Sequence, residues 1–390
     1  MHVKPILHKM LSSVMHLKRL NSLIIIVRAT FEAKQLSVTG LGRSLLLPIQ
    51  ERSGIRKVDR LVGNKKLHEQ RHDVYREVAQ QLIGNKRCPW LLVDWSPVPN
   101  TTHNLLRAAL VCEGRALSVF EEVHPASKLG NRKVQKSFLE RLKKILPAGC
   151  SPIVVTDAGY HTSWFKAVRK LGWDYVGRVR GLVKYCPEGE AQWFSLKKIH
   201  RQATKNAKRL GRVTLSKSEP FEGILCYYKG TAKGRVNKNK LGQRQQSTDS
   251  KNNAKSAKEP WVLLTSLEGY SVAKRVVKIY QCRMQIEEGF RDLKSSKYGF
   301  GFEQAHSHKI ERIENLLLIA MLASLIAWIV GWFAEKEKLH YKFQANSIKH
   351  RRVLSLFYLG CRIIKKKIRI KLKSLSTIAE QLIWAETEIC

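Results

Sequence analysis

Three acidic side chains stand at positions that suit metal-dependent chemistry on a phosphodiester. Asp94 lies inside the apolar run LLVDWSPV, Asp157 follows the apolar residues of SPIVVTDAGY, and Glu287 lies on a helix expected over 271–294. Cleaving a phosphodiester requires an activated water or 3′-hydroxyl and a stabilised leaving oxygen, and two Mg2+ ions can provide both. Mg2+ prefers carboxylate and water oxygens. An aspartate that closes a strand is also a common turn residue, so the prediction depends on the three acids together.

The expected helix carries cations beside its glutamate. At about 100° per residue from Tyr280, four further polar residues fall on one face. An apolar stripe that packs on a sheet adjoins this face. The cations are expected to bind DNA phosphates, whereas a solvated, salt-bridged face is the alternative. The four residues are Arg283, Glu287, Arg291 and Lys294.

The order of the expected elements positions the two aspartates. Three strands open as an antiparallel meander, with a tight Glu-Gly-Arg turn between the second and the third. Strands and helices then alternate, which is the order of a ribonuclease-H-like mixed sheet. In such a sheet the first and fourth strands are neighbours, so Asp94 and Asp157 are expected at adjacent strand ends. The strands are expected at 91–98, 104–114, 115–125, 151–160 and 173–181, and the helices at 133–147 and 162–172.

The alternation is interrupted between residues 182 and 260. The runs WFSLKKI, RVTLSK and FEGILCYYKG read as short strands of a β-rich insertion. Residues 229–258 are polar and rich in lysine, which is typical of a mobile basic loop or arm. WVLLTSL (261–267) returns to a strand before the long helix.

Basic helices are expected at the start of the chain. Leu20–Gln35 reads as one helix, and Ser37 and Thr39 can cap a second, short one. In GIRKVDRLVGN the apolar residues share one arc, and Arg56, Lys57 and Arg60 fall opposite. Two short helices with a basic outer face resemble a helix-turn-helix, and an ordinary amphipathic helix is the alternative.

The charge balance indicates an anionic partner. The chain has 71 Lys and Arg against 31 Asp and Glu, a net charge of +40. Because basic residues occur in every segment, nucleic acid is favoured over a membrane surface. The eight cysteines include no C-x2-C pair, so neither a zinc site nor a disulfide framework is predicted, and a reducing cytosol is expected.

One apolar segment, Leu316–Ala334, leaves two interpretations open. Its 19 residues carry no charge, so its length would suffice to span a bilayer. The alternative is a helix buried in a large core, which is favoured because no second span accompanies it.

Several motifs in the same order resemble one protein family. They are HLKRLNSL, RLVGNKKLH, LLVDWS, VVTDAGY, KLGW, RVRG, SAKEPWVL and RMQIEEGFRDLKS. From about residue 16 to 361 the chain resembles bacterial cut-and-paste transposases of the DDE type in insertion-sequence family four. Its likeness is closest to the transposase of the composite transposon that carries tetracycline resistance. The group's signature Y-x2-R-x3-E-x6-K is met by Tyr280, Arg283, Glu287 and Lys294.

The resemblance implies a role for individual residues. Asp94, Asp157 and Glu287 would bind the catalytic Mg2+, for which Mn2+ can substitute. Glu288 lies about 100° further round the helix, so Glu287 is preferred as the ligand. The other three signature residues would contact terminal DNA phosphates. Trp261 would stack on a flipped base, although a strand tryptophan in the core is the alternative.

Two departures from the family pattern affect finer details. Met284 stands where some relatives carry a second aromatic for the flipped base. The tail beyond about residue 361 matches only loosely, and it would carry dimer contacts. The apolar segment coincides with a core helix of the family fold, which argues against a membrane.

The expected fold class is α/β, a ribonuclease-H-like mixed sheet with a β-rich insertion and helical terminal regions. The expected protein is a cytoplasmic, nucleoid-associated transposase that acts on DNA as a homodimer. It would bind inverted repeats, excise its element through a hairpin intermediate and join it to target DNA. Alternatives are a structure-selective nuclease of the same fold, a catalytically decayed DNA-binding repressor and a membrane protein. The expected domains are 1–88 (helical, DNA-binding), 89–184 (catalytic core), 185–260 (insertion), 261–345 (catalytic core) and 346–390 (helical).

Overall fold

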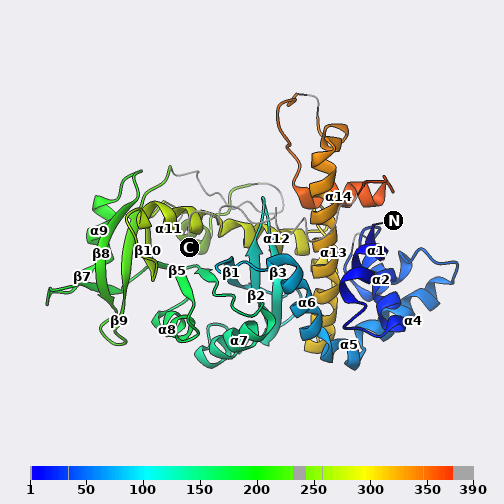
Figure 1. The fold of residues 1–390 in the computed structure, drawn as a ribbon, viewed down its shortest axis with the longest axis horizontal. Helices are drawn as coiled ribbons and strands as arrows, with labels where there is room; N and C mark the ends of the chain where they lie inside the picture. Colours follow the sequence, from blue (N-terminus) through cyan, green and yellow to red (C-terminus); the bar gives the residue numbers. More distant parts are fainter. Residues whose placement is uncertain (1, 34, 232–242, 257, 346, 372–390) are drawn as a thin grey trace. The chain divides into compact units, whose positions relative to one another are not determined.

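The fold was analysed in a computed structural model that describes residues 2–33, 35–231, 243–256, 258–345 and 347–371 (Figure 1). The chain forms two compact units. The terminal unit comprises Met1–Pro152 and Met284–Cys390, and the middle unit comprises Ile153–Arg283. The expected functional domains follow other boundaries and stay a prediction.

Six helices open the terminal unit, and the expected short helix begins where its cap was predicted. The Ser37 hydroxyl accepts a hydrogen bond from the Gly40 backbone N–H at 3.1 Å, as an N-cap should. The helices α3 and α4 cross at two glycines, because a Cβ on Gly42 would lie 2.5 Å from the Ile55 Cα. The six helices are α1 Val3–Leu11, α2 Leu17–Ala29, α3 Val38–Arg43, α4 Glu51–Val62, α5 Lys65–Glu69 and α6 Arg71–Ile83.

The expected three-stranded meander follows these helices. β2 pairs with β1 and with β3, both antiparallel, and a bulge interrupts the second pairing at Ala108/Ala109. The turn between β2 and β3 is tight, and Gly114 adopts φ +68° there, a conformation that favours glycine. These elements are β1 Trp90–Pro97, β2 His103–Val111, β3 Ala116–Pro125, the 3-10 turn η1 Ala126–Lys128 and α7 Arg132–Ile145.

A long apolar helix, α13 (Ile310–Lys336), forms the core of the terminal unit. It is long and apolar enough to cross a membrane, yet 94% of its most apolar window is buried inside the protein. It packs against α2, α14 and β3, so it is a core helix and not a membrane span. Figure 1 shows α14 crossing it. The neighbouring elements are α12 Met284–Lys294, η2 Phe302–Gln304, η3 Leu339–Lys342 and α14 Leu356–Lys365.

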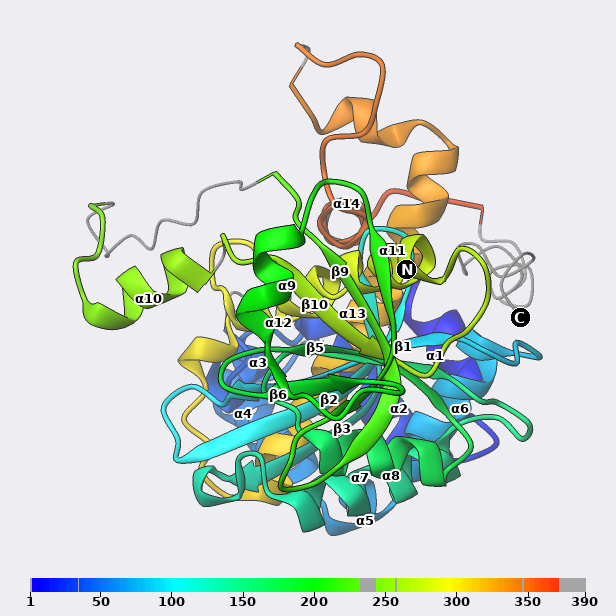
Figure 2. The same cartoon turned by 90° about the vertical axis from the view of Figure 1, so that its left-hand side faces the viewer.

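The middle unit contains one parallel strand pair and an antiparallel run. β4 and β5 are parallel, whereas β5, β10, β9, β8, β6 and β7 pair antiparallel in that order. Figure 2 shows β9 and β10 side by side, in green. The elements are β4 Ile153–Thr156, α8 Thr162–Lys170, β5 Asp174–Val179, β6 Lys184–Pro187, β7 Phe194–Ser195, α9 Leu196–Gln202, β8 Lys208–Leu215, β9 Phe221–Tyr228, α10 Thr248–Ser256, β10 Trp261–Thr265 and α11 Val272–Gln281.

The mixed α/β class with a ribonuclease-H-like core is confirmed, and three local predictions were wrong. The segment WFSLKKI was predicted as a strand, but most of it forms helix α9. The Ser195 hydroxyl accepts a hydrogen bond from the Lys197 N–H at 3.3 Å and so caps the helix, and the side chains of Leu196 and Ile199 are buried on one helical face. The expected loop 229–258 contains helix α10, while its residues 232–242 lie outside the described part of the chain.

The long helix expected over 271–294 is the third error, because it divides into α11 and α12 at Cys282–Arg283. The N–H groups of these two residues bond to carbonyls three residues back, Ile279 and Tyr280, which tightens the last turn of α11. The apolar stripes of α11 and α12 belong to different compact units. The shared face predicted for Tyr280, Arg283 and Glu287 assumed one unbroken helix, and the structure has two.

Candidate active site

Asp94 is the fifth of the eight residues of β1, in the terminal unit. The apolar residues before it are buried, and Asp94 itself is half-buried. Its Oδ1 atom accepts a hydrogen bond from the Trp95 backbone N–H at 2.8 Å. Across the strand pair it stands opposite Arg107, whose side chain is buried and pairs with Glu121 at 2.5 Å. A buried guanidinium therefore lies in the cross-strand position beside this carboxylate.

Helix α12 brings Glu287 to the same strand. Within α12, Arg291 and Lys294 fall within about 40° of Glu287. The Lys294 Nζ donates hydrogen bonds to the Ser96 Oγ at 2.7 Å and to the Pro97 carbonyl at 2.6 Å. Ser96 shares the face of β1 that carries Asp94, because side chains alternate along a strand. The structure thus places the glutamate face of α12 beside the end of β1.

The neighbouring acid on α12, Glu288, is paired with two arginines. Its carboxylate pairs with Arg291 of its own helix and lies 3.6 Å from the Arg115 guanidinium. A carboxylate paired with two cations is a poor candidate for a metal ligand. This pairing therefore counts against Glu288 as a metal ligand.

Lys294 is buried to an unusual degree for a lysine. Burial lowers its pKa to about 8, and the positive charge of Arg107 adds to this effect. Lys294 is therefore charged at neutral pH and loses its proton as the pH rises through about 8.

Asp157 lies in the middle unit, directly after β4. Its Oδ1 atom accepts a hydrogen bond from the Gly159 backbone N–H at 2.8 Å, the geometry of an Asx turn. Its charge acts on Tyr280, a buried residue of α11. Burial is the main cause that raises the pKa of Tyr280; Arg283 and Arg178 oppose this, and Asp157 adds to it. Asp157, Tyr280 and Arg283 therefore share one electrostatic environment within this unit.

Aromatic rings continue from Tyr280 within the middle unit. The half-buried Trp261 packs edge-on against Tyr280, with ring centroids 4.9 Å apart. Its other neighbour is Tyr228, at 5.7 Å. The Arg283 guanidinium lies 5.9 Å from the Tyr280 ring. Trp261 is thus fixed between two aromatic residues, beside the cation predicted to contact phosphate.

Arg178 and Arg107 are site residues that sequence reasoning missed. Arg178 lies on β5, and burial lowers its pKa. Its buried Nε has no hydrogen-bond partner among the described residues, although its Nη2 lies 4.0 Å from Glu259. The sequence signal for Arg178 was its spacing from Arg180. Two arginines two residues apart on a strand place their side chains on the same face.

The basic residues of α4 line an open groove in the terminal unit. Arg56 and Arg60 are exposed, and Lys57 is half-buried. No acidic side chain is among the residues that line this groove. The rest of the wall comes from α2 and the residue before it, from α4 and from the N-cap of α5, namely His16, Lys18, Arg19, Ser22, Ser53, Leu61 and Asn64.

The donor set of the predicted triad suits a hard divalent cation. All three side chains offer carboxylate oxygens and are half-buried, and each aspartate is oriented by a backbone N–H. These are the ligands that Mg2+ prefers. Among the residues that the structure describes, no three His, Cys, Asp or Glu side chains converge as a preformed metal cluster.

A comparison with protein families decides the class of this site. The family model described as the transposase DDE domain matches residues 90–326. The chain belongs to this transposase family. The match begins at the first residue of β1 and ends within α13, so this transposase carries all three predicted acids inside its family domain. No curated protein matches the chain.

Membership of the family fixes the general activity. The chain is a transposition enzyme that acts on DNA, and enzymes of this family generally use divalent metal ions. The helices α1–α6 precede the matched region.

Proposed function

We propose that this transposase is a member of insertion-sequence family four that excises and inserts its element as a homodimer in the bacterial cytoplasm. Asp94, Asp157 and Glu287 would bind Mg2+, or Mn2+ in its place. The observation that supports this most is the packing of the Glu287 face of α12 beside the end of the Asp94 strand, with Lys294 bonded to Ser96.

The bound metals would activate the attacking oxygen and stabilise the leaving oxygen. Around them the chain's own residues position the DNA. Lys294, Arg291 and Arg283 would bind phosphates near the scissile bond, and Tyr280 would add a hydroxyl donor. Trp261 would stack on a base extruded when the end forms a hairpin.

Excision in cells tests the proposal. The reading frame would act on a donor plasmid that carries the DNA flanking it, with Glu287→Gln as the control. We expect loss of the segment with the wild-type protein alone. If Glu287→Gln also excises the segment, the catalytic assignment is wrong. Cutting without end specificity and without joining would instead indicate a nuclease, and end binding without cutting would indicate a repressor.

The basic groove of α4 is expected to bind the terminal repeat. Each phosphate contact contributes about −0.9 to the slope of log K against log salt. Replacing Arg56, Lys57 and Arg60 together by glutamine should therefore make this slope shallower by about 2 to 3 and weaken end binding. Fluorescence anisotropy over a salt series measures both quantities.

A matched variant controls for total charge. Lys133, Lys143 and Lys144 are exposed on α7, and their replacement by glutamine removes the same three charges. We expect this control to change the slope by less than one. Equal changes in the two triple variants would show that net charge, and not the groove, determines end binding.

Lys294 is expected to make end binding dependent on pH. Its pKa of about 8 means that its contact with a phosphate is strongest below pH 8 and weakens above it. A charged hydrogen bond is worth about 1.5–3 kcal/mol, so wild-type affinity should exceed that of Lys294→Met by about tenfold or more at pH 7. The advantage should shrink towards pH 9.5. A ratio that stays constant across this range would contradict the prediction.

A further inference from the structure

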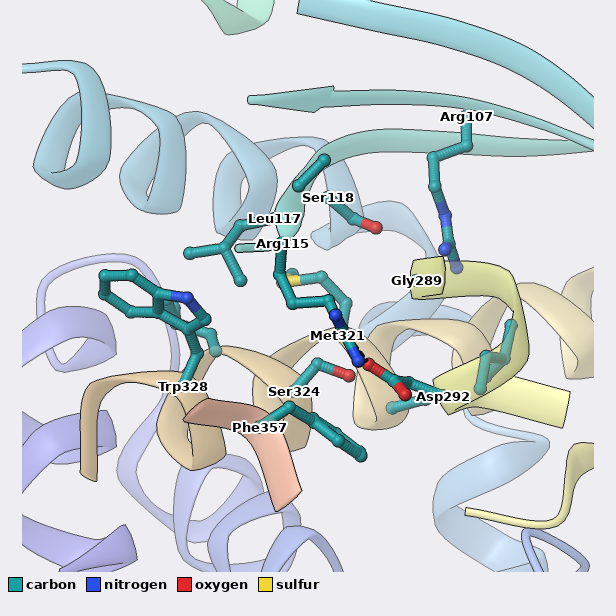
Figure 3. A pocket seen from close by; sticks show the side chains of 14 residues that line it. Arg107, Arg115, Leu117, Ser118, Gly289, Asp292, Met321, Ser324, Trp328 and Phe357 are labelled. Carbon is teal, nitrogen blue, oxygen red and sulfur yellow. Dashed lines mark hydrogen bonds and ion pairs between the residues drawn. The ribbon is translucent and has the colours of Figure 1, made fainter. Parts of the chain in front are cut away.

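The side of α12 that faces away from Lys294 is held by an arginine from a distant turn. Arg115 follows Gly114 in the turn between β2 and β3. Its Nε donates a hydrogen bond to the Asp292 Oδ2 at 2.6 Å, and its Nη2 lies 3.6 Å from the Glu288 carboxylate. Figure 3 shows the guanidinium of Arg115 meeting the carboxylate of Asp292. One cation therefore binds two carboxylates on successive turns of α12.

This arginine does not face a surface where DNA could bind. The side chain of Arg115 is 14% exposed and that of Asp292 is 9% exposed. The cavity beside them has a volume of about 30 Å3, which holds a water molecule and is far too small for a nucleotide. Its other walls include Ser118, Ser324 and Trp328 (Figure 3). Arg115 therefore acts inside the protein.

The positions of its two partners define the rotation of α12. At about 100° per residue, Glu288 lies about 100° and Asp292 about 140° round the helix from Glu287. Lys294 lies about 20° from Glu287 on the other side and is bonded to the end of β1. The helix is thus held on two sides of the catalytic glutamate. Positioning within about 0.5 Å and 10–20° is what a catalytic group needs from its supports.

The turn that carries Arg115 is itself fixed to the core. The indole N–H of Trp328, a buried residue of α13, donates a hydrogen bond to the Glu113 carbonyl at 3.2 Å. Arg352 also lies 3.4 Å from the Glu113 carboxylate and pairs with Glu335 of α13. Because α13 is the buried core helix, the turn is a rigid support for the guanidinium.

We propose that Arg115 is a positioning residue of this transposase, which fixes the rotation of α12 so that the Glu287 carboxylate is presented to the metal ion beside Asp94. The inference rests on the proposed function of Glu287. Arg115 contacts neither DNA nor metal and acts only through Glu288 and Asp292.

Metal binding by the full-length protein tests this role separately from catalysis. Binding of Mn2+ would be followed by electron paramagnetic resonance, and the part lost in Glu287→Gln would define binding at the site. Supporting residues of a metal site typically contribute about 10- to 100-fold in metal affinity or activity. We expect Arg115→Gln to weaken this Mn2+ binding by about that factor and to raise the Mg2+ concentration for half-maximal nicking similarly. Affinity for the DNA end should not change.

Arg71→Gln is the matched control, because Arg71 of α6 is also buried, at 6% exposed against 14% for Arg115, and pairs with Glu314 of α13 rather than with α12 or the β2–β3 turn. It should lower the melting temperature without changing the Mn2+ affinity. Should Arg115→Gln fail to fold, Asp292→Asn removes the same ion pair with little change in shape and should weaken Mn2+ binding in the same direction.

The outcomes separate the inference from the function on which it rests. Wild-type Mn2+ affinity in folded Arg115→Gln, or in Asp292→Asn where the first variant does not fold, would overturn the positioning role. An equal loss in Arg71→Gln would also overturn it, since it would show a general effect of stability. Absence of nicking by the wild-type protein would count against the proposed function, while the Mn2+ comparison would still decide the role of Arg115.

Discussion

Replacing Asp94 or Asp157 by asparagine, or Glu287 by glutamine, is expected to abolish strand cleavage and to leave binding of the transposon end unchanged. Each amide keeps the shape of the side chain and removes the negative charge that a divalent metal requires. Loss of a metal costs several kcal/mol of transition-state stabilisation, and a loss of about 4 kcal/mol slows the reaction about a thousandfold. A single-turnover nicking assay on a preassembled end complex measures this directly.

The control for this experiment is the same chemical change at an exposed position. Glu140 lies on α7 with a half-exposed side chain that pairs with Lys136, at 4.0 Å. Glu140→Gln should nick at the wild-type rate. If any of the three amide variants still cuts at more than a few per cent of that rate, the assignment of that residue is wrong. If a variant also loses end binding, its effect is on folding or DNA recognition and not on the metal.

Sequence reasoning performed best where local chemistry determines the structure. The Ser37 cap of α3 and the tight turn at Gly114 were both predictable, because a side-chain oxygen and a positive φ are local requirements. Asp157 was predictable as a strand-end acid, because an apolar run that ends in an aspartate is visible in one short segment, whereas Asp94 lies within β1 and not at its end.

The division of the long helix could not be predicted from its periodicity. The spacing of apolar residues continues at 3.6 per turn from Val272 to Leu293, so the pattern contains no interruption at Cys282. The apolar stripes of α11 and α12 belong to different compact units. A single sequence does not show which core a stripe joins, so it could not show that the helix is divided.

The supports of the site were invisible for a similar reason. Arg115 and Asp292 are separated by 177 positions, and Lys294 and Ser96 by 198. No spacing rule connects such residues, since tertiary packing brings them together. By contrast, the sequence correctly favoured a buried core helix for the apolar segment of α13. The alternative of a membrane span was excluded by the burial of this helix in the structure.

The second large effect is expected where α13 and α14 cross. A Cβ on Gly360 would overlap the carbonyl oxygen of Ala327, and a Cβ on Gly331 would overlap that of Leu356. The obstacles are backbone atoms, which cannot rotate away as side chains do. Gly360→Ala should therefore force the helices apart and reduce the free energy of unfolding by about 3 kcal/mol or more, at or above the upper end for overpacked cores.

A second helical glycine provides the contrast that makes this prediction specific. A Cβ on Gly289 of α12 would come no closer than 3.5 Å to any neighbour, and alanine in place of glycine within a helix gains about 0.5–1 kcal/mol. Gly289→Ala should therefore unfold at the same or a higher urea concentration than the wild type. Urea titration followed by the intrinsic fluorescence of the nine tryptophans compares the two variants. Equal midpoints for Gly360→Ala and the wild-type protein would show that the crossing tolerates a methyl group, and that the close approach of α13 and α14 does not stabilise the core.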